Sequence, residues 1–329
     1  LVLTGGYFFL PLFFPGYDAS FHSLMYRSLW ILAPFPFLIS LGVLCKAQLD
    51  AAGKYLYGTL TPAITVCVLL VFITMTSPQL GVLCLPIAIL IGASVEGTCL
   101  GYFSSIKWKG GLSKPLQRDL LKAFAPIMGA SLFMGSTIFV DQYMASLTGS
   151  GNITALNYGY RLVMFFATFA VTCLITVLYP HFSRCISQGN IPLLKKHCTL
   201  FSVLVCLSSI PLCIGLYMFS EDSIRILFGR GAFSEEDVFL VSRIQVCLVP
   251  LIPFYILSVM YTRILAALNK NRFVLYVSIA NLIVNIVCNY VGMYYFGVVG
   301  IAVSTSVVYL LSSGVLWLFL NSFFSASHD

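Results

Sequence analysis

Residues Ile153–Leu178, ITALNYGYRLVMFFATFAVTCLITVL, decide the fold class of this chain. The stretch is apolar and long enough to cross a lipid bilayer, which takes about 20 residues of helix. It contains one charged side chain, Arg161, and an arginine cannot shed its charge. Placing that charge at membrane depth costs from about 2.5 kcal/mol to well above that figure. We therefore expect a helical membrane protein in which water, an acidic side chain or an anionic substrate offsets this cost.

The composition of the whole chain supports a membrane protein. Of its 329 residues, 59% are hydrophobic and 9% are charged, whereas roughly 25% of the residues of a soluble domain are charged. The net charge of +7 could suggest nucleic acid as a partner. However, the basic residues are scattered between apolar segments and are not gathered on one solvated face. The composition therefore predicts an all-α polytopic membrane protein that binds no nucleic acid.

Nine segments are long and apolar enough to span a membrane as helices. They are residues 23–49, 58–76, 80–105, 120–147, 153–181, 199–219, 238–268, 273–295 and 298–320. Their length and continuity do not fit the alternating strands of a β-barrel. An apolar run that starts at Leu1 has no signal-peptide pattern, and we interpret it as the end of a truncated helix. The sequence thus predicts nine complete spans and one truncated span.

Lys and Arg residues orient this predicted bundle through the positive-inside rule. They concentrate in four connections, at residues 46–54, 107–122, 184–196 and 263–272. The connections between the second and third, the fourth and fifth, and the eighth and ninth segments contain none. We therefore expect the four basic connections to face the cytoplasm.

Two connections carry further structural signals. The polar stretch KWKGGLSKPLQRD, residues 107–119, is rich in Gly, Lys and Pro and is typical of a boundary between lobes. It divides the chain into an N-terminal lobe, residues 1–112, and a C-terminal lobe, residues 113–329. Farther along, Ser234 and Asp237 match the S-x-x-D pattern of a helix capping box. A helix is therefore expected to start directly after Ser234.

Asp141 and Arg161 are ionisable residues on consecutive predicted helices, joined by a short turn near Gly149–Gly151. Each lies about ten residues from that turn, which places both at a depth of roughly 15 Å. They could therefore form an ion pair, either as a structural contact between the helices or as a cavity-facing pair used in transport. The second interpretation is favoured because a purely structural buried pair seldom repays its desolvation.

Other polar residues within the apolar segments have two interpretations each. Asn281, Asn285 and Asn289 follow i, i+4, i+8 spacing and form one polar stripe on a helix. The stripe could hydrogen-bond a neighbouring helix, or its amide oxygens could bind a hard cation together with a carboxylate and a hydroxyl. Glu96 lies in a run of small residues and is either cavity-facing or satisfied by helix packing.

Motifs of enzymes and of structural metal sites are missing from the sequence. It contains no H-E-x-x-H, G-x-S-x-G, Walker or Rossmann motif. Most of the eleven cysteines lie inside apolar runs, where we expect small core residues and no disulfide framework. The histidines, at positions 22, 181, 197 and 328, lie at predicted helix ends or in polar connections. We therefore predict that they form no metal cluster.

Several stretches carry a family resemblance: ALNYGYRL at residues 155–162, VLYPHFSR at 177–184, ILFGRGAFSEED at 226–237, and the segments from 264 to 306. Together they resemble the MurJ (MviN) family of lipid II flippases, in the multidrug/oligosaccharidyl-lipid/polysaccharide exporter superfamily. The resemblance implies that the nine segments correspond to the fourth to twelfth helices of a fourteen-helix fold, with two lobes around a central cavity. It also implies a transporter, not an enzyme, that lies in the inner membrane of a bacterium and flips an undecaprenyl-pyrophosphate-linked sugar by alternating access.

The resemblance further implies site residues. Arg161 would bind the substrate pyrophosphate through charge-assisted hydrogen bonds, in exchange for Asp141. The family's other cavity arginines belong to the first two helices, which are absent here. In some members an Asp, an Asn/Asp pair four residues apart and a Thr hold a sodium ion. The matching residues are Asp141, Asn285, Asn289 and Thr305. Because Asn289 replaces a carboxylate, the identity of the coupling ion stays open, and no other cofactor or metal is expected.

A second departure from the family pattern is Tyr160, where many lipid II flippases have an aspartate. The stretch YGYRL resembles that of exopolysaccharide exporters, so another lipid-linked glycan, such as an O-antigen precursor, is an alternative substrate. Two other classes also stay open: an intramembrane glycosyltransferase or polymerase acting on the same lipid carrier, and an ion-coupled drug exporter. Neither the sugar nor the oligomeric state follows from the sequence.

Overall fold

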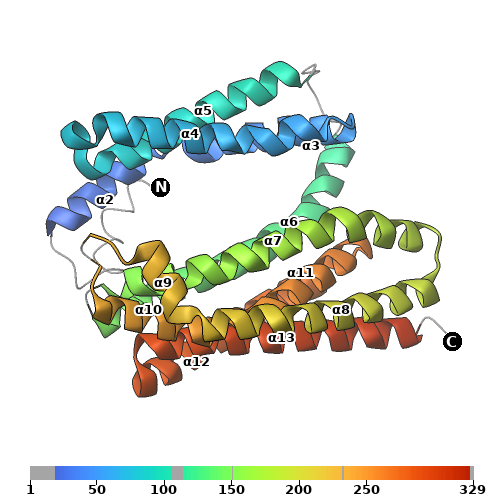
Figure 1. Cartoon of the computed structure of the whole chain (residues 1–329). Coiled ribbons are helices and arrows are strands. Elements are labelled where there is room, and N and C mark those ends of the chain that lie inside the picture. The colour runs from blue at the N-terminus through green and yellow to red at the C-terminus, as the bar shows by residue number, and fades with distance from the viewer. Residues whose placement is uncertain (1–18, 105–113, 150, 232, 327–329) are drawn as a thin grey trace. The chain divides into compact units, whose positions relative to one another are not determined.

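The computed structural model describes residues 19–104, 114–149, 151–231 and 233–326, and all regular elements within these ranges are helices. This confirms the prediction of an all-α fold. The chain divides into two compact units, residues 1–112 and 113–329 (Figure 1). Residues 107–113 of the predicted linker lie outside the described residues. Its remainder, from Lys114 onward, belongs to a helix. Pro115 lies in the first turn of this helix, where backbone N–H groups have no partner within the helix, so the missing N–H of proline costs nothing.

The described residues of the first unit, 19–104, form four α-helices and a single 3₁₀ turn. These are α2 (Ala19–Ile31), α3 (Phe35–Ala51), α4 (Tyr55–Leu80), η1 (Gly81–Leu83) and α5 (Cys84–Phe103). The predicted span at residues 23–49 is thus two helices, separated by a turn that ends at Pro34. The turn fits this sequence because proline has no N–H for the helical ladder and restricts the residue before it.

Helices α4 and α5 approach each other closely at Gly92. A Cβ on Gly92 would lie only 3.1 Å from Cα of Thr65, so the absence of a side chain permits this contact. One helical turn along α5, the hydroxyl of Thr65 donates a hydrogen bond of 2.5 Å to the carboxylate of Glu96. The half-buried Glu96 therefore has a partner on the adjacent helix, which supports the interpretation that helix packing satisfies it.

Eight helices lie in the part of the second unit that the structure describes. They are α6 (Lys114–Thr148), α7 (Asn152–Ser187), α8 (Ile191–Met218), α9 (Ser220–Phe228), α10 (Glu235–Leu248), α11 (Leu251–Ala267), α12 (Asn271–Phe296) and α13 (Val298–Ala326). Helix α11 lies in the core, where it packs against α7 and α13, while α6 packs along α12. Leu251, Ile252, Ile264 and Leu265 of α11 are fully buried. Their burial supplies the apolar contacts that hold this unit together.

Seven helices within the described residues are long and apolar enough to cross a membrane, or eight if α10 and α11 form one bent span. The polytopic membrane character is therefore confirmed. The exact number of spans stays a prediction. The sequence predicts nine, and the predicted segment that is not among these eight is the fifth, residues 153–181, which corresponds to α7 (Asn152–Ser187). The truncated N-terminal helix lies outside the described residues. The predicted span at 238–268 is bent by 44° between α10 and α11, where Pro250 cannot donate to the helical ladder.

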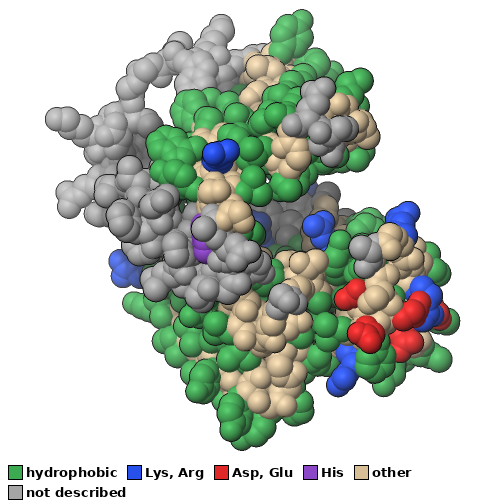
Figure 2. All heavy atoms as spheres, turned by 90° about the vertical axis from the view of Figure 1, so that its left-hand side faces the viewer, with side chains coloured by type: hydrophobic (Ala, Val, Ile, Leu, Met, Phe, Trp, Pro, Cys, Tyr) green, Lys and Arg blue, Asp and Glu red, His purple; other side chains and the backbone are tan. Residues whose placement is uncertain are grey.

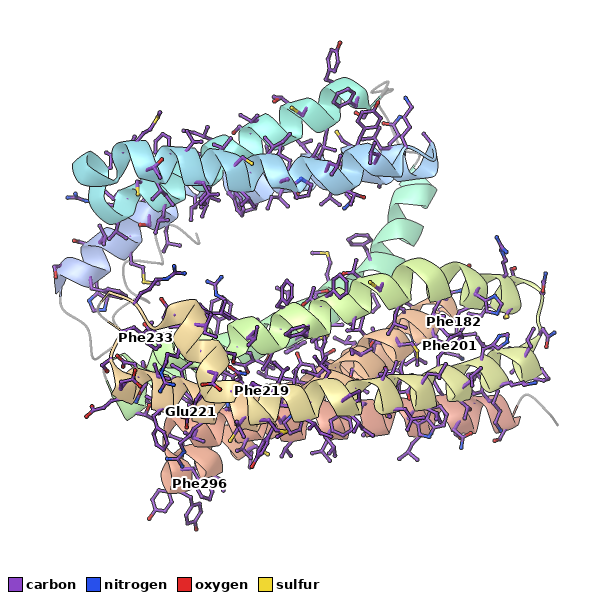
Figure 3. The ribbon with its side chains drawn as sticks, viewed as in Figure 1. Phe182, Phe201, Phe219, Glu221, Phe233 and Phe296 are labelled. Atoms are coloured by element: carbon purple, nitrogen blue, oxygen red, sulfur yellow. The ribbon has the colours of Figure 1, made fainter. Side chains whose placement is uncertain are left out.

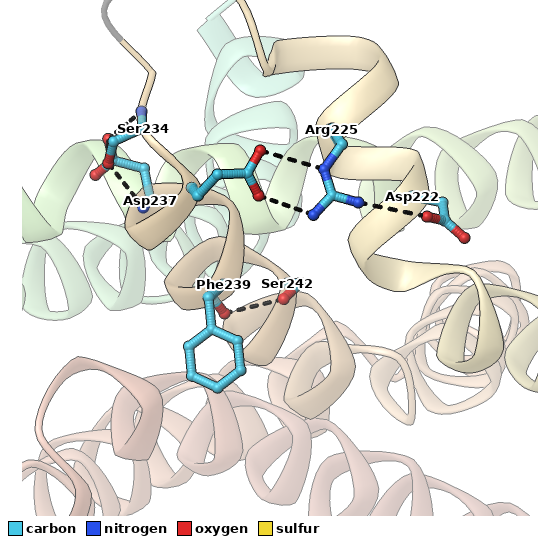
Figure 4. Close-up of polar contacts among 7 residues, drawn as sticks. Asp222, Arg225, Ser234, Asp237, Phe239 and Ser242 are labelled. Carbon is cyan, nitrogen blue, oxygen red and sulfur yellow. Dashed lines mark hydrogen bonds and ion pairs between the residues drawn. The ribbon is translucent and has the colours of Figure 1, made fainter.

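The predicted capping box is confirmed at the start of α10. The backbone N–H of Asp237 donates to the Ser234 hydroxyl, and the Ser234 N–H donates to the Asp237 carboxylate at 2.9 Å (Figure 4). Beside it, Arg225 of α9 forms an ion pair with Glu235 at 2.8 Å, and this hydrogen bond raises the pKa of Arg225. The first turns of α9 and α10 contain acidic side chains, which are stabilised by the positive end of each helix dipole. Basic side chains lie next to them on the surface (Figure 2).

Helices α12 and α13 form a tight antiparallel hairpin. Gly297 ends α12 with φ 61° and ψ −139°, a conformation that essentially only glycine adopts. Farther from the turn, a Cβ on Gly292 would lie 2.6 Å from the carbonyl oxygen of Gly300, so both glycines are needed for this backbone contact. The Ser304 hydroxyl donates to the Cys288 carbonyl at 2.7 Å. This close packing brings polar side chains of the two helices together.

All eleven cysteines are free, as expected. Four of them, Cys45, Cys84, Cys185 and Cys198, are buried. Cys67, Cys173 and Cys206 are exposed on the protein surface instead. The prediction of small core residues thus holds for only part of the set, because an apolar run in a membrane helix does not distinguish the core face from the lipid face.

Candidate functional site

A buried carboxylate, that of Asp141 on α6, is the centre of the candidate site. Its side chain is 5% exposed, and its Oδ1 atom accepts hydrogen bonds from the Nδ2 atoms of Asn285 and Asn289 at 3.0 and 2.6 Å. The hydroxyl of Thr305 on α13 lies 3.5 Å from Oδ2 of the same carboxylate. The structure therefore brings together, from three helices, all four residues that the family resemblance implied.

Local geometry explains this convergence. Asn285 and Asn289 are one helical turn apart, so both side chains leave the same face of α12. That face lies against α6, and the close α12–α13 hairpin brings Thr305 to the same depth. The third asparagine of the stripe, Asn281, donates to the Ser312 hydroxyl on α13 at 2.9 Å. At Asn281 the stripe therefore serves as a helix–helix hydrogen bond.

Tyr160 on α7 is a further member of this cluster. Its hydroxyl oxygen lies 3.3 Å from Oδ2 of Asp141 and 3.0 Å from the hydroxyl oxygen of Thr305. In the sequence, Tyr160 stands out only as a departure from the family pattern. That departure was the only signal for it in the sequence. Consecutive residues of a helix point about 100° apart, so Tyr160 faces a different side of α7 from Arg161.

The predicted ion pair between Asp141 and Arg161 is wrong. In the described part of the chain, the partners of Asp141 are neutral groups, and Arg161 is exposed. Equal depth from the connecting turn does not make two side chains face each other. Tyr160 occupies the side of α7 that faces α6, and Arg161 therefore points elsewhere.

Arg161 instead lines an open groove between α7 and the segment from α9 to α10. The groove is lined by Thr154, Tyr158, Arg161, Leu227, Phe228, Arg230 and Phe233. The ring of Tyr158 contacts the rings of Phe228 and Phe233, with centroids 4.7 and 5.6 Å apart. Arg230, which was not among the predicted site residues, thus joins Arg161 in a groove with two positive charges and an aromatic wall. The signal for it was the RGAF stretch.

The Asp141 cluster fits a hard monovalent cation. Oδ1 of Asn289 is buried and has no hydrogen-bond partner among the described residues, so it is an oxygen available to an ion. The carboxylate of Asp141, the Thr305 hydroxyl and the Asn285 amide oxygen complete a set of oxygen donors, which hard cations prefer. Asp141, Asn285 and Thr305 border a cavity of about 260 Å³ that is lined by residues of α6, α7, α11, α12 and α13, whereas Asn289 is fully buried behind it.

Two histidines lie together away from this cluster; the prediction that the histidines form no metal cluster did not anticipate this contact. His181 on α7 and His197 on α8 are in direct contact, and Cys185 lies beside them. Their positions in sequence did not indicate this, because the contact depends on how the α7–α8 hairpin aligns its two helices.

Comparison with known proteins places the chain in a family. The family described as "Lipid II flippase MurJ" matches residues 1–326. The chain belongs to this family. It is 28% identical over 261 residues to a probable lipid II flippase MurJ of Buchnera aphidicola subsp. Baizongia pistaciae. The aligned region covers 75% of the chain and 50% of the relative. It is 23% identical to a probable lipid II flippase MurJ of Synechocystis, over 98% of the chain and 63% of the relative. The chain thus spans between half and two thirds of these MurJ relatives.

Solved structures show the same fold. A lipid II flippase MurJ in an inward closed conformation superposes with a TM-score of 0.80 at 22% identity, over 97% of the chain and 69% of that structure. An inward-facing multidrug resistance MATE transporter of the MOP superfamily superposes with a TM-score of 0.83 at 13% identity, over 99% of the chain and 77% of that structure. The chain therefore shares its fold with a multidrug resistance transporter as well as with a MurJ flippase.

Proposed function

We propose that the chain forms part of a flippase for lipid II, or for a closely related lipid-linked sugar pyrophosphate, in a bacterial inner membrane. The relatives named as probable lipid II flippases support this substrate class. The observation that carries the proposal is the arrangement along α7. Tyr160 contacts the buried carboxylate of Asp141, while the adjacent Arg161 lines a groove with a second arginine.

The groove has the chemistry to bind a pyrophosphate. Arg161 and Arg230 both line it, and guanidinium groups form paired, charge-assisted hydrogen bonds with phosphate oxygens. The aromatic rings of Tyr158, Phe228 and Phe233 reduce the water around these charges, which strengthens the attraction to an anion. Binding of the pyrophosphate would also offset the cost of holding Arg161 at membrane depth.

The Asp141 cluster would provide ion coupling. Asp141, Asn285, Asn289 and Thr305 would hold Na⁺. The ion would neutralise the charge of the Asp141 carboxylate, which the amide N–H groups stabilise only in part. Asp141 is the one carboxylate of this cluster, since Asn289 and Tyr160 are uncharged. A single negative charge favours a monovalent ion over a divalent one. An ion that binds one conformation more tightly than the other shifts the equilibrium between them by that difference in affinity.

The proposal is tested with Arg161→Ala, Arg161→Lys and Arg230→Ala in the full-length protein, reconstituted into liposomes with a lipid-linked sugar pyrophosphate. Transbilayer movement of the lipid is measured. We expect a large loss of rate for Arg161→Ala, a partial loss for the other two variants, and none for Arg184→Ala, an exposed arginine of α7 outside the groove. A wild-type rate for Arg161→Ala at normal expression would contradict the role of the groove.

The same preparation distinguishes the other classes. Polymerised sugar formed from the lipid carrier would indicate a glycosyltransferase. Cation-dependent efflux of dyes, with no movement of the lipid-linked sugar, would indicate a drug exporter.

A further inference from the structure

The end of the α7–α8 hairpin contains two imidazoles and a thiol in one cluster. His181 and Cys185 are one helical turn apart on α7, and His197 is on α8. One ligand atom from each residue lies within 4.8 Å of the others, and Nε2 of His181 is 2.9 Å from Nδ1 of His197. Cys185 is buried, His197 is half-buried and His181 is exposed. The three residues therefore form a partly enclosed cluster with one side open to ions.

The hairpin holds this cluster in place. Gly189 adopts a φ of 66° in the turn between the helices, and Asn190 caps the start of α8 through a hydrogen bond from the Leu193 N–H. Next to the cluster, the rings of Phe182 and Phe201 pack edge to face with centroids 6.0 Å apart (Figure 3). The ring of His197 is 6.3 Å from that of Phe201. Aromatic packing thus aligns α7 and α8 at the level where the three ligand atoms meet.

We propose that His181, Cys185 and His197 bind a transition-metal ion, with Zn²⁺ as the best match. Two imidazole nitrogens and a thiolate are ligands of this borderline-soft ion. With bond lengths of about 2.0–2.3 Å, tetrahedral ligand atoms lie roughly 3.3–3.6 Å apart, so small side-chain rotations would complete the site. Water would occupy the fourth position, on the exposed side of His181. This inference does not rest on the proposed flippase function.

Two features favour the metal over a bare hydrogen bond between the histidines. The direct contact needs one ring nitrogen to donate and the other to accept, and it leaves the Cys185 thiol outside the interaction. The metal uses all three groups at once and joins α7 to α8. In addition, the basic residues of this connection predict a cytoplasmic location, where thiols stay reduced and available to metals.

The site is tested with purified full-length protein in detergent, titrated with Co²⁺ alone. Thiolate coordination gives a near-ultraviolet charge-transfer band. The matched variants are Cys185→Ala and Cys198→Ala, since both thiols are buried in the same hairpin but Cys198 is outside the cluster. We expect the band in the wild type and in Cys198→Ala, its loss in Cys185→Ala, and its removal by Zn²⁺. Absence of the band in the wild type, or an unchanged band in Cys185→Ala, would overturn the proposal.

A second measurement covers a folding defect in Cys185→Ala. His181→Gln changes an exposed side chain, so the protein is expected to fold. Since changes to groups that only support a ligand weaken metal binding roughly 10–100-fold, the loss of a ligand should weaken Zn²⁺ binding by at least as much. Zn²⁺ should also raise the melting temperature of the wild type, and raise that of His181→Gln only at higher Zn²⁺ concentrations. Equal Zn²⁺ affinity of the two proteins would refute the site.

Discussion

The hydroxyl oxygen of Tyr160 lies 3.3 Å from Oδ2 of Asp141 and links α7 to α6 beside the hydroxyl of Thr305 on α13. The next residue of α7, Arg161, lines a groove on another side of the helix together with Arg230. Helix α7 therefore contacts both the carboxylate cluster and the basic groove. A movement of α7 would therefore act on both, as the proposed coupling of an ion to an anionic substrate requires.

Asp141→Asn should abolish the effect of Na⁺ on stability, because it removes the negative charge of the cluster with little change in shape. The measurement is the melting temperature of the full-length protein in NaCl and in choline chloride. For the wild type at a Na⁺ concentration 100 times the Kd, we expect stabilisation of about 2.7 kcal/mol. Glu96→Gln, which removes a half-buried carboxylate from the first unit, serves as control and should keep the response. An unchanged Na⁺ response in Asp141→Asn would exclude Asp141 as a ligand.

Asn289→Asp should strengthen the dependence on Na⁺. It places a second carboxylate where the Asn289 amide nitrogen now lies 2.6 Å from Oδ1 of Asp141. Two carboxylates at this distance repel each other unless a cation or a proton lies between them. The variant should therefore melt at a lower temperature than the wild type without Na⁺ and show a larger rise when Na⁺ is added. Asn281→Asp, whose partner is the Ser312 hydroxyl, should show no such gain.

Tyr160→Phe should weaken Na⁺ binding and leave the packing of the ring intact. The substitution removes only the hydroxyl, which lies 3.0 Å from the hydroxyl of Thr305. Loss of a hydrogen bond of this kind costs about 1 kcal/mol, and the Na⁺ concentration that gives half of the stabilisation should rise accordingly. Tyr309→Phe removes a hydroxyl from the same cavity lining and is the matched control. If both variants shift the Na⁺ midpoint equally, the effect belongs to the cavity and not to the Tyr160 contact.

Gly300→Ala should separate α12 from α13, because a Cβ at this position overlaps the backbone of Gly292. Overpacking of this kind costs about 1–3 kcal/mol, or more where the backbone must shift. The melting temperature should fall, and the response to Na⁺ should weaken because Thr305 moves away from Asp141. Gly314→Ala on the same helix has open space around its Cβ. It should instead leave stability unchanged or raise it by up to about 1 kcal/mol. A stable Gly300→Ala protein would show that the contact is not required.

Contacts and shared helix faces predicted from the sequence are observed where they depend on residues close together in the chain. Ser234 and Asp237 form their capping box because both partners lie within one helical turn. Asn285 and Asn289 share a face of α12 for the same reason. The implied set of Asp141, Asn285, Asn289 and Thr305 comes together, although its arrangement in space came from a family resemblance and not from spacing.

The sequence by itself determined the all-α class, the membrane character and the residues that share a helix face, since hydropathy, segment length and helical periodicity are local properties. Only the tertiary structure decided which side of α7 meets α6, and thus that Tyr160 and not Arg161 reaches Asp141. It also decided that His181 meets His197 across sixteen residues of chain. Both contacts depend on the rotation of a helix about its axis and on its alignment with a neighbour. Distant side chains set these two quantities through packing, and no local pattern specifies them.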